Sequence, residues 1–263
     1  MTTDAPQELL ALASELARAA GEFARDGRAR GLDDVTTKST ITDVVTEYDR
    51  ASEALIVDRL RIERPGDGLI GEEGTDDPGT SGISWVIDPI DGTTNFLYDL
   101  PSYAVSIGVT DADGPLVGAV YLPVTDELFT ARRGGGAHRN GRPIRCSTVT
   151  DMAVALVATG FGYSPERRSR QARVVGELIP QVRDIRRLGS AAIDLCYAAC
   201  GRVDAYYEQW LNPWDRAAGE LIAAEAGARV SEYPARPGEP NGLLVAPPGL
   251  YEALERFFTD VNH

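Results

Sequence analysis

Two carboxylates, Asp88 and Asp91, stand three positions apart where an apolar run of the sequence gives way to a turn. The segment from Trp85 to Phe96 reads W-V-I-D-P-I-D-G-T-T-N-F. Pro89 cannot donate a hydrogen bond to a sheet and is expected to end a strand, and Gly92 permits a tight turn. Carboxylates bind hard cations, and the free N–H groups at a helix start bind phosphate. The segment therefore predicts metal-assisted phosphate chemistry.

The residues after Gly92 are expected to open a helix and to complete the chemistry. Thr93, Thr94 and Asn95 are residue types whose side chains cap helix N-termini. The N–H groups of Gly92 and Thr93 are then expected to hold the phosphate. Asp49 and Thr93 are expected to orient and deprotonate the attacking water.

Further carboxylates are expected to converge on the same crevice. Glu72 and Asp215, like Asp88 and Asp91, each follow an apolar strand or begin a helix, and a sheet edge gathers such side chains. Two divalent ions about 4 Å apart would activate a water and neutralise the leaving oxygen. Oxygen ligands favour Mg²⁺, with Mn²⁺ as the alternative, over Zn²⁺. The competing interpretation is that these acids cap helices or lie in solvated turns. It is favoured for any single acid but not for Asp88 and Asp91 together.

Composition limits the partners of the chain. Its 263 residues are 43% hydrophobic and 25% charged, which is ordinary for a soluble globular protein. The net charge of -14 argues against a nucleic-acid or anionic-membrane binder. No segment reaches the roughly 18 apolar residues of a membrane span, and the N-terminus lacks a signal-peptide layout. Three cysteines do not make a disulfide framework, so a cytoplasmic location is expected.

The first half of the chain is expected to lay two helices on an antiparallel sheet that includes a meander. A polar loop is expected at residues 28–42, and a capping box of Thr46 and Asp49 is expected to open the second helix. The expected helices cover residues 7–25 and 47–64. The expected strands cover residues 68–71, 85–87, 103–110, 114–121 and 127–131.

The second half alternates strands and helices, which is typical of an α/β layer. The domain boundary is expected near residues 145–150. Residues 1–147 would form an α+β domain with the two helices and the metal-binding loop, and residues 148–263 an α/β domain that completes the site. The expected strands cover residues 153–159, 186–188, 204–207 and 242–246, and the expected helices cover 165–179, 190–199, 213–226 and 249–258.

Several segments together resemble the inositol monophosphatase family. D-P-I-D-G-T-T-N-F at residues 88–96 and W-D-R-A-A-G-E-L-I-A-A-E-A-G at 214–227 are similar to its two signatures. G-E-E at 71–73, T-D-V-V-T-E-Y-D at 42–49 and G-S-A-A-I-D-L at 189–195 match in order and spacing. The resemblance covers nearly the whole chain and is closest to the bacterial suppressor-type branch. It implies a layered αβαβα fold of the α/β (α+β) sugar-phosphatase type, usually a homodimer, that hydrolyses small phosphomonoesters with Mg²⁺ and is inhibited by lithium.

The resemblance also implies which residues hold the metal ions. Glu72, Asp88 and the carbonyl of Ile90 are implied to hold the first ion. Asp88, Asp91 and Asp215 are implied to hold the second. Glu72 with water molecules is implied to serve a third, more weakly bound ion.

Substrate contacts are implied in the same way. Asp49 and Thr93 match the pair that activates the water, with Glu72 beside them among the catalytic residues. Glu208 matches an acid that hydrogen-bonds inositol hydroxyls, and Lys38 matches a lysine on a mobile loop that closes toward the metals. The residues implied to contact substrate are Lys38, Gly92, Thr93, Thr94, Gly189, Ser190, Ala191, Glu208 and Asp215.

The match is weakest between Glu208 and Asp215, where bulky Trp210 stands at a position that is small in many members. This segment borders the pocket of the leaving group, so the choice of substrate stays open. The expected reaction is hydrolysis of myo-inositol monophosphate to myo-inositol and phosphate. The alternatives are the same chemistry on histidinol phosphate, fructose-1,6-bisphosphate or a nucleotide phosphate, and a regulatory protein associated with RNA or the transcription machinery.

Two further clusters are expected to be structural. Cys196 and Cys200, four positions apart on a helix and at its end, are expected to be buried thiols. A basic run in this acidic chain is expected to form a solvated helix face or a subunit contact instead of a nucleic-acid patch. That run consists of Arg167, Arg168, Arg170 and Arg173.

Overall fold

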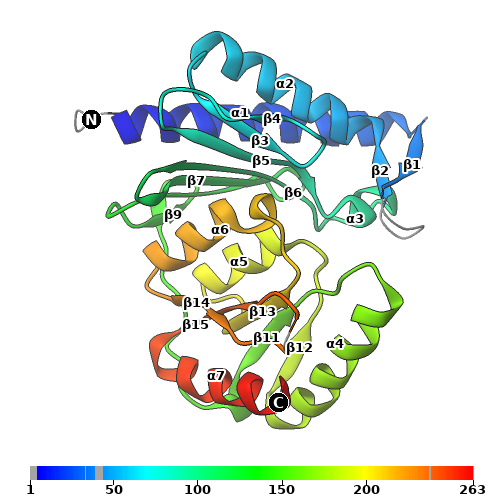
Figure 1. Ribbon diagram of the computed structural model, residues 1–263, viewed down its shortest axis with the longest axis vertical. Helices are drawn as coiled ribbons and strands as arrows, with labels where there is room; N and C mark the ends of the chain where they lie inside the picture. The colour runs from blue at the N-terminus through cyan, green and yellow to red at the C-terminus, as the bar shows by residue number, and fades with distance from the viewer. Residues whose placement is uncertain (1–4, 33, 39–43, 237, 263) are drawn as a thin grey trace.

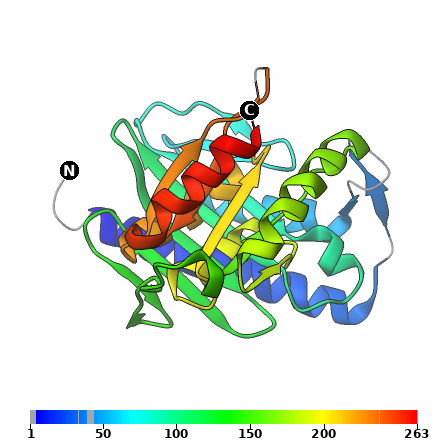
Figure 2. The ribbon, with the colours of Figure 1, turned by 90° about the horizontal axis from the view of Figure 1, so that it is seen from below.

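Helices and sheets alternate in five layers along the molecule (Figure 1). The computed structural model describes residues 5–32, 34–38, 44–236 and 238–262. The predicted αβαβα sandwich is confirmed. Helices α1 and α2 cover one face of the first sheet, α5 and α6 lie between the sheets, and α4 and α7 cover the far face of the second (Figures 1 and 2). The helices of these layers are α1 (Ala5–Arg30), α2 (Glu47–Glu63), α4 (Pro165–Leu178), α5 (Ala191–Ala199), α6 (Pro213–Glu225) and α7 (Pro248–Asn262).

The first sheet has eight strands in the order β10-β9-β8-β7-β6-β5-β3-β4. The prediction of an entirely antiparallel sheet is wrong at one place, because β3 runs parallel to β5. The intervening chain, which includes β4, is long enough to return to the same end of the sheet. The strands are β3 (Gly68–Gly71), β4 (Asp76–Asp77), β5 (Ser84–Asp91), β6 (Ala104–Asp111), β7 (Gly114–Leu122), β8 (Glu127–Arg132), β9 (Ala137–Arg139) and β10 (Arg142–Pro143).

The second sheet has five strands in the order β12-β11-β13-β15-β14 and mixes parallel with antiparallel pairs. Its edge strand β14 was not predicted, because only two residues of R-V-S-E-Y are apolar and one side of the strand has no partner strand. The segment expected as a strand at 153–159 begins with a short 3₁₀ helix at Met152–Val154. The strands are β11 (Leu156–Thr159), β12 (Asp184–Arg186), β13 (Ala205–Gln209), β14 (Arg229–Tyr233) and β15 (Gly242–Ala246).

The N-terminal helices differ from expectation at their ends. Helix α1 extends beyond residue 25 because Ala24 and Gly27 still pack inward, and Gly27 leaves room for the ring of Tyr48. The expected loop is partly the hairpin of β1 (Val35–Thr37) and β2 (Val44–Thr46). Thr42 and Asp43 of the matching motif lie outside the described residues. The predicted capping box is confirmed, since Thr46 and Asp49 cap α2 reciprocally.

The interior between the two sheets is apolar. Helices α5 and α6 pack there against both sheets, and Leu195, Ile222 and Tyr206 are each at most 1% exposed. Cys196 is buried in the same layer, and the three cysteines form no disulfide. None of the helices in the described part of the chain combines the length and hydropathy of a membrane crossing.

Candidate active site

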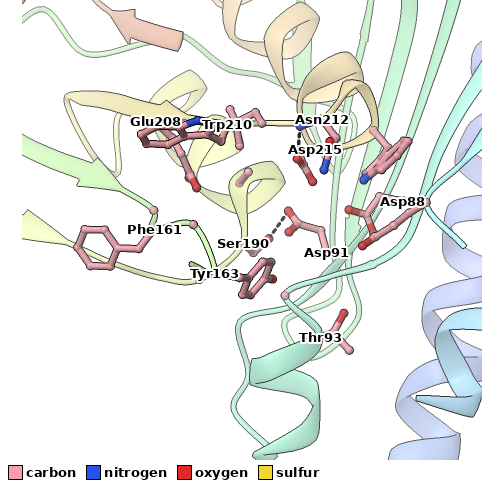
Figure 3. A pocket seen from close by; sticks show the side chains of 18 of the residues that line it. Asp88, Asp91, Thr93, Phe161, Tyr163, Ser190, Glu208, Trp210, Asn212 and Asp215 are labelled. Atoms are coloured by element: carbon pink, nitrogen blue, oxygen red, sulfur yellow. Dashed lines mark hydrogen bonds between the residues drawn. The ribbon is translucent and has the colours of Figure 1, made fainter. Parts of the chain in front are cut away.

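A cavity of about 480 Å³ opens where strands of both sheets end. Its lining includes residues that follow β5, β11, β12 and β13 (Figure 3). Four carboxylates form one side, named here the carboxylate wall, and they are Glu72, Asp88, Asp91 and Asp215. A second group of lining residues, named the arginine wall, consists of residues 161–164, Arg167, Arg187 and Trp210.

The centre of the carboxylate wall is the irregular end of β5. Pairing with β6 shifts register between Asp88 and Asp91, as expected where Pro89 cannot donate to the ladder. Both carboxylates are 9% exposed or less. Asp88 Oδ1 accepts a hydrogen bond from the Ile90 N–H at 3.1 Å. The bulge therefore turns two acidic side chains of one strand into the cavity.

Asp91 is fixed by a helix that comes about 100 residues later in the chain. Its Oδ2 accepts hydrogen bonds from Ser190 Oγ at 2.8 Å and from the Ala192 N–H at 2.6 Å (Figure 3). Ser190 is the N-cap of α5 and also accepts from the Ile193 N–H. The carboxylate thus lies at the positive end of a helix, which favours its charged form.

Asp215 and Glu72 reach the wall from two other elements. Asp215 stands in the first turn of α6, where its Oδ2 accepts from the Asn212 N–H at 2.5 Å in a capping box. Glu72 follows β3, and its N–H donates to the Ile87 carbonyl at 3.2 Å. The structure thus brings together the four acids that the sequence proposed as metal ligands.

Burial and neighbouring charges raise the pKa of Asp88, Asp91 and Asp215. Burial raises the pKa of Asp88 well above its usual range, and the charges of Glu72, Asp91 and Asp215 add to the rise. Burial and the charge of Asp91 likewise raise the pKa of Asp215. Burial raises the pKa of Asp91 to about 6, against the hydrogen bonds from Ala192 and Ser190. A bound cation would reverse these shifts, because it stabilises the ionised forms.

Lys38 brings one positive charge to this wall. Its Nζ lies 2.9 Å from Glu72 Oε1 and 2.5 Å from Glu73 Oε1. Burial opposes the charged ammonium, but Glu72 and Glu73 outweigh that effect and raise the pKa of Lys38. Burial raises the pKa of Glu73 to about 7 despite Lys38. Glu53, which the sequence analysis did not single out, holds this loop by accepting from the Glu73 N–H at 2.7 Å.

Asp49 and Thr93 form a connected pair beside the carboxylates. Asp49 Oδ2 accepts from the N–H and the hydroxyl of Thr46, at 2.8 and 2.6 Å. Thr93 Oγ1 lies 2.9 Å from Asp49 Oδ1 and 3.1 Å from the Ile90 carbonyl, so its single proton serves one of the two acceptors at a time. Burial raises the pKa of Asp49 to about 6.

Gly92 makes the turn between β5 and the five-residue helix α3 (Thr93–Leu97). Its φ of 97° suits glycine, and a Cβ would lie 2.9 Å from the Ser102 carbonyl and 3.2 Å from the Gly189 carbonyl. Gly92 itself is the N-cap, so the prediction that Thr93, Thr94 or Asn95 caps this helix is wrong. The Asn95 side chain instead donates to the Ser102 and Leu188 carbonyls, which ties this turn to the Gly189–Ala191 segment.

Glu208 lies at the edge of the arginine wall. Its Oε2 accepts from the Tyr206 hydroxyl at 2.7 Å, and the lack of a side chain at Gly160 leaves room for its carboxylate. Burial raises the pKa of Glu208 to about 7, while the Tyr206 hydrogen bond and Arg187 oppose the rise. Gly189, Ser190 and Ala191 line the same cavity, as the resemblance implied.

The arginine wall was largely missed in the sequence. Arg187 directly follows β12, and Phe161 is the second residue after β11. The rule that strand ends carry residues of a site therefore applied to them as it did to Asp88. The basic run was expected to form a solvated face or a subunit contact. Arg167 does not fit that description fully, because it is exposed but also lines the cavity. Trp210 lines the cavity too, whereas Tyr206 and Tyr207 are core residues.

The donor set of the carboxylate wall fits Mg²⁺. The wall supplies oxygen atoms only, and its buried, mutually repelling carboxylates lack a compensating charge other than Lys38 among the described residues. Within that part of the chain no three His, Cys, Asp or Glu side chains already form a closed ligand cluster. Lys38 Nζ donates to Glu72 Oε1, and backbone N–H groups donate to one oxygen each of Asp91 and Asp215.

A five-layer sandwich with this cavity at its strand ends is the arrangement that the family resemblance implied. The sequence model of the inositol monophosphatase family matches residues 5–260. The chain therefore belongs to the inositol monophosphatase family.

Individual relatives agree with this assignment. Inositol-1-monophosphatase SuhB of Mycobacterium tuberculosis is 44% identical over 276 residues, which cover 96% of this chain and 95% of that protein. The Nus factor SuhB of Escherichia coli is 47% identical over 193 residues, or 73% of this chain and 72% of that protein. The crystal structure of the extragenic suppressor protein suhB from Bartonella henselae superimposes with a TM-score of 0.88 at 33% identity, covering 95% of this chain and 98% of that one.

Proposed function

We propose that this protein is a Mg²⁺-dependent phosphomonoesterase that hydrolyses myo-inositol monophosphate to myo-inositol and phosphate. The observation that carries the proposal is the meeting of four carboxylates, the Gly92 turn and the Asp49 and Thr93 pair at one cavity. The name inositol-1-monophosphatase of a relative with 44% identity supports inositol phosphate as the substrate.

The ligand assignment follows the family pattern. Glu72, Asp88 and the Ile90 carbonyl would hold one Mg²⁺ ion, and Asp88, Asp91 and Asp215 a second. Glu72 with water would serve a third ion. When bound, Mg²⁺ would supply the positive charge that lowers the pKa of a water molecule and neutralises the phosphate oxygens.

Residues of the chain orient the reactants. The Thr93 hydroxyl donates to Asp49, which leaves its lone pairs to accept a hydrogen bond from the attacking water. The raised pKa of Asp49, about 6, suits a base that takes the Thr93 hydroxyl proton while Thr93 takes a proton from the attacking water. N–H groups of Gly92, Thr93 and Thr94 would bind the phosphate oxygens.

The alcohol that leaves is bound on the other side of the cavity. Glu208 keeps one oxygen on Tyr206 and would use the other to accept a hydrogen bond from an inositol hydroxyl. Gly189, Ser190 and Ala191 would line this pocket, and Lys38 would close the loop over the metal side. The position of Glu208 suits a polyol better than an ester without hydroxyl groups.

A panel of phosphate esters tests the proposal. Phosphate release by the purified protein in Mg²⁺ is measured on myo-inositol 1-phosphate, histidinol phosphate, fructose-1,6-bisphosphate and a nucleoside monophosphate. We expect efficient turnover of the inositol ester. A higher kcat/KM on another member of the panel would change the assigned substrate but not the proposed reaction. No phosphate release from any of them would contradict the proposal.

The Nus factor name of a relative with 47% identity favours a second candidate function, a regulatory role with RNA or the transcription machinery. The net charge of -14 makes a protein partner more suitable than direct RNA binding. A complex with the transcription machinery that survives Asp91→Asn would support this role. Loss of the complex in that variant, with its fold intact, would count against a role separate from the active site.

We further propose a homodimer that is inhibited by Li⁺ and acts in the cytoplasm, with domains at residues 1–147 and 148–263. The dimer and the inhibition by Li⁺ follow the family pattern, and the domain boundary follows the change to alternating strands and helices. The free thiols Cys146, Cys196 and Cys200 suit a reducing compartment. Sedimentation equilibrium tests the dimer, and a Li⁺ titration of phosphate release tests inhibition. A monomer, or activity that is indifferent to Li⁺, would contradict them.

A further inference from the structure

We propose that the arginine wall is a binding subsite for a second phosphate group, so that the cavity also takes phosphomonoesters carrying a further phosphate several atoms from the scissile one. The inference rests on the proposed function, because it takes the scissile phosphate to lie at the carboxylate wall. Two cationic side chains, two stacking rings and one strained residue carry it.

The two arginines of this wall lack ion-pair partners. Within the described residues, neither Arg167 nor Arg187 lies within 4.0 Å of a carboxylate, whereas Arg170 of the same helix pairs with Glu166 and Glu239. Arg187 is near enough to Glu208 and Asp194 to oppose the rise in the pKa of both buried carboxyl groups, but forms no ion pair with either. Positive charge at the cavity is therefore left for a ligand.

Both guanidinium groups are stacked on rings. Arg187 Cζ lies 5.8 Å from the centroid of the Phe161 ring, and Arg167 Cζ lies 5.2 Å from that of Trp210. A guanidinium that stacks through its face keeps its N–H donors in the plane, where they can bind phosphate in a fork. The stacked arrangement thus fixes the donors in advance.

One loop of the chain, at residues 161 and 162, lies beside both arginines. Arg187 stacks on Phe161, and a Cβ at the next residue, Gly162, would lie 3.3 Å from Arg167 Cδ. Ser164, the N-cap of α4, also lines the cavity, so the positive end of that helix adds to the same field. Both arginines and the start of this helix thus line the same cavity beside one loop.

The backbone of Trp210, a residue of the arginine wall, is strained. Its φ of 66° is in the left-handed region, which is strained for a residue with a side chain. This backbone carries the ring beside Arg167 and Arg170. The strained backbone therefore places an aromatic ring against two cationic side chains at the cavity.

The dimensions of the cavity allow both groups to be bound together. Figure 3 shows Phe161, Tyr163 and Trp210 on the side away from Asp88, with Asp91 and Ser190 between. A volume of about 480 Å³ is within the range of small-molecule sites. A sugar or polyol with phosphates at two ends would contact both walls, while a monoester would contact one.

Equilibrium binding tests the subsite independently of turnover. In protein with Thr93→Val, which keeps the ester intact by slowing hydrolysis, dissociation constants in Mg²⁺ are measured for fructose 1-phosphate and fructose-1,6-bisphosphate. We expect the bisphosphate to bind at least about tenfold more tightly, as a charge-assisted contact to two arginines implies. Arg167→Gln and Arg187→Gln should each reduce that ratio at least about threefold.

Arg173→Gln is the matched control, since it removes the same charge from an exposed position of α4 outside the cavity, and we expect it to leave the ratio unchanged. Equal binding of the two esters, or a ratio that falls as much with Arg173→Gln, would overturn the subsite. Absence of phosphate release from monoesters by the unmodified protein would contradict the proposed function instead, while the binding ratio would still decide the subsite.

Discussion

The two walls of the cavity are built in opposite ways. On the carboxylate wall, Asp91 and Asp215 are held by backbone N–H groups at helix starts, and Asp88 by the N–H of Ile90 within a β-bulge. On the arginine wall, Arg167 and Arg187 are held by stacking on aromatic rings. Hydrogen bonds to the backbone fix single carboxylate oxygens, whereas stacking on a ring fixes the plane of a guanidinium and leaves its N–H donors for a ligand. The comparison suggests that one wall determines the reaction and the other selects the ester.

Asp91→Asn should have the largest effect and acts on the carboxylate wall alone. We expect phosphate release from myo-inositol 1-phosphate to fall about 10³-fold or more, because a neutral amide loses the charge that the metal site requires. An amide oxygen can still accept from Ser190 and Ala192, so the fold should persist. Phosphate release and circular dichroism measure the two properties, and full activity in a folded variant would disprove the role of Asp91.

Thr93→Val tests the pair that orients the water. The change keeps the shape of a side chain that is 8% exposed but removes the hydroxyl that bonds to Asp49. We expect kcat to fall about 10²-fold with KM nearly unchanged, as for loss of general-base assistance. Steady-state kinetics measure both constants, and Thr93→Ser, which restores the hydroxyl, should recover most of the activity. An unchanged kcat in Thr93→Val would exclude this role.

Gly160→Ala tests the role of Glu208 at the edge of the arginine wall. The new methyl group would collide with the Glu208 carboxylate, so that carboxylate must move away from Tyr206. We expect kcat/KM on myo-inositol 1-phosphate to fall about tenfold, with little change on p-nitrophenyl phosphate, which has no hydroxyl to bind. Gly176→Ala is the control, because a Cβ there meets nothing within 4 Å. An equal loss of kcat/KM on both esters would mean that Glu208 does not bind the alcohol part of the substrate.

The pH dependence of stability should show the smallest effect. Asp49 and Asp91 have pKa values of about 6 in the metal-free fold, above the usual value near 4, so the folded state holds more protons between about pH 4 and 6. Stability of metal-free protein should therefore fall as pH rises through that window. Mg²⁺ at about 100 times its dissociation constant should add roughly 2.7 kcal/mol at pH 8 and less at pH 5. Thermal unfolding measures this stabilisation. Equal stabilisation at both pH values would show that Mg²⁺ binding does not depend on the ionisation of these carboxylates.

The carboxylate wall could be predicted from sequence because it lies in two contiguous motifs. D-P-I-D-G-T-T-N-F contains the bulge, both acids and the turn, and W-D begins α6 with Asp215 in its first turn. The alternation of strands and helices in the second half was likewise sufficient for an α/β layer, whereas the five-layer arrangement came from the family resemblance. Local rules sufficed there, since caps and turns depend on neighbours in the chain.

The arginine wall could not be predicted because its residues meet only through tertiary packing. Phe161, Arg187 and Trp210 come from loops after three different strands, and their stacking pairs have no sequence spacing in common. The parallel pairing of β3 with β5 and the edge strand β14 were missed for a similar reason. Each depends on a partner that is distant in sequence or on a few apolar residues.

The metal dependence of phosphate release tests the central claim most directly. Protein stripped with EDTA is supplied with myo-inositol 1-phosphate, and phosphate is followed as Mg²⁺ is added back. We predict no release without metal and a saturable rise with Mg²⁺, because the buried acids of the carboxylate wall act only with a cation between them and the phosphate. Release in EDTA equal to that in saturating Mg²⁺ would contradict the account.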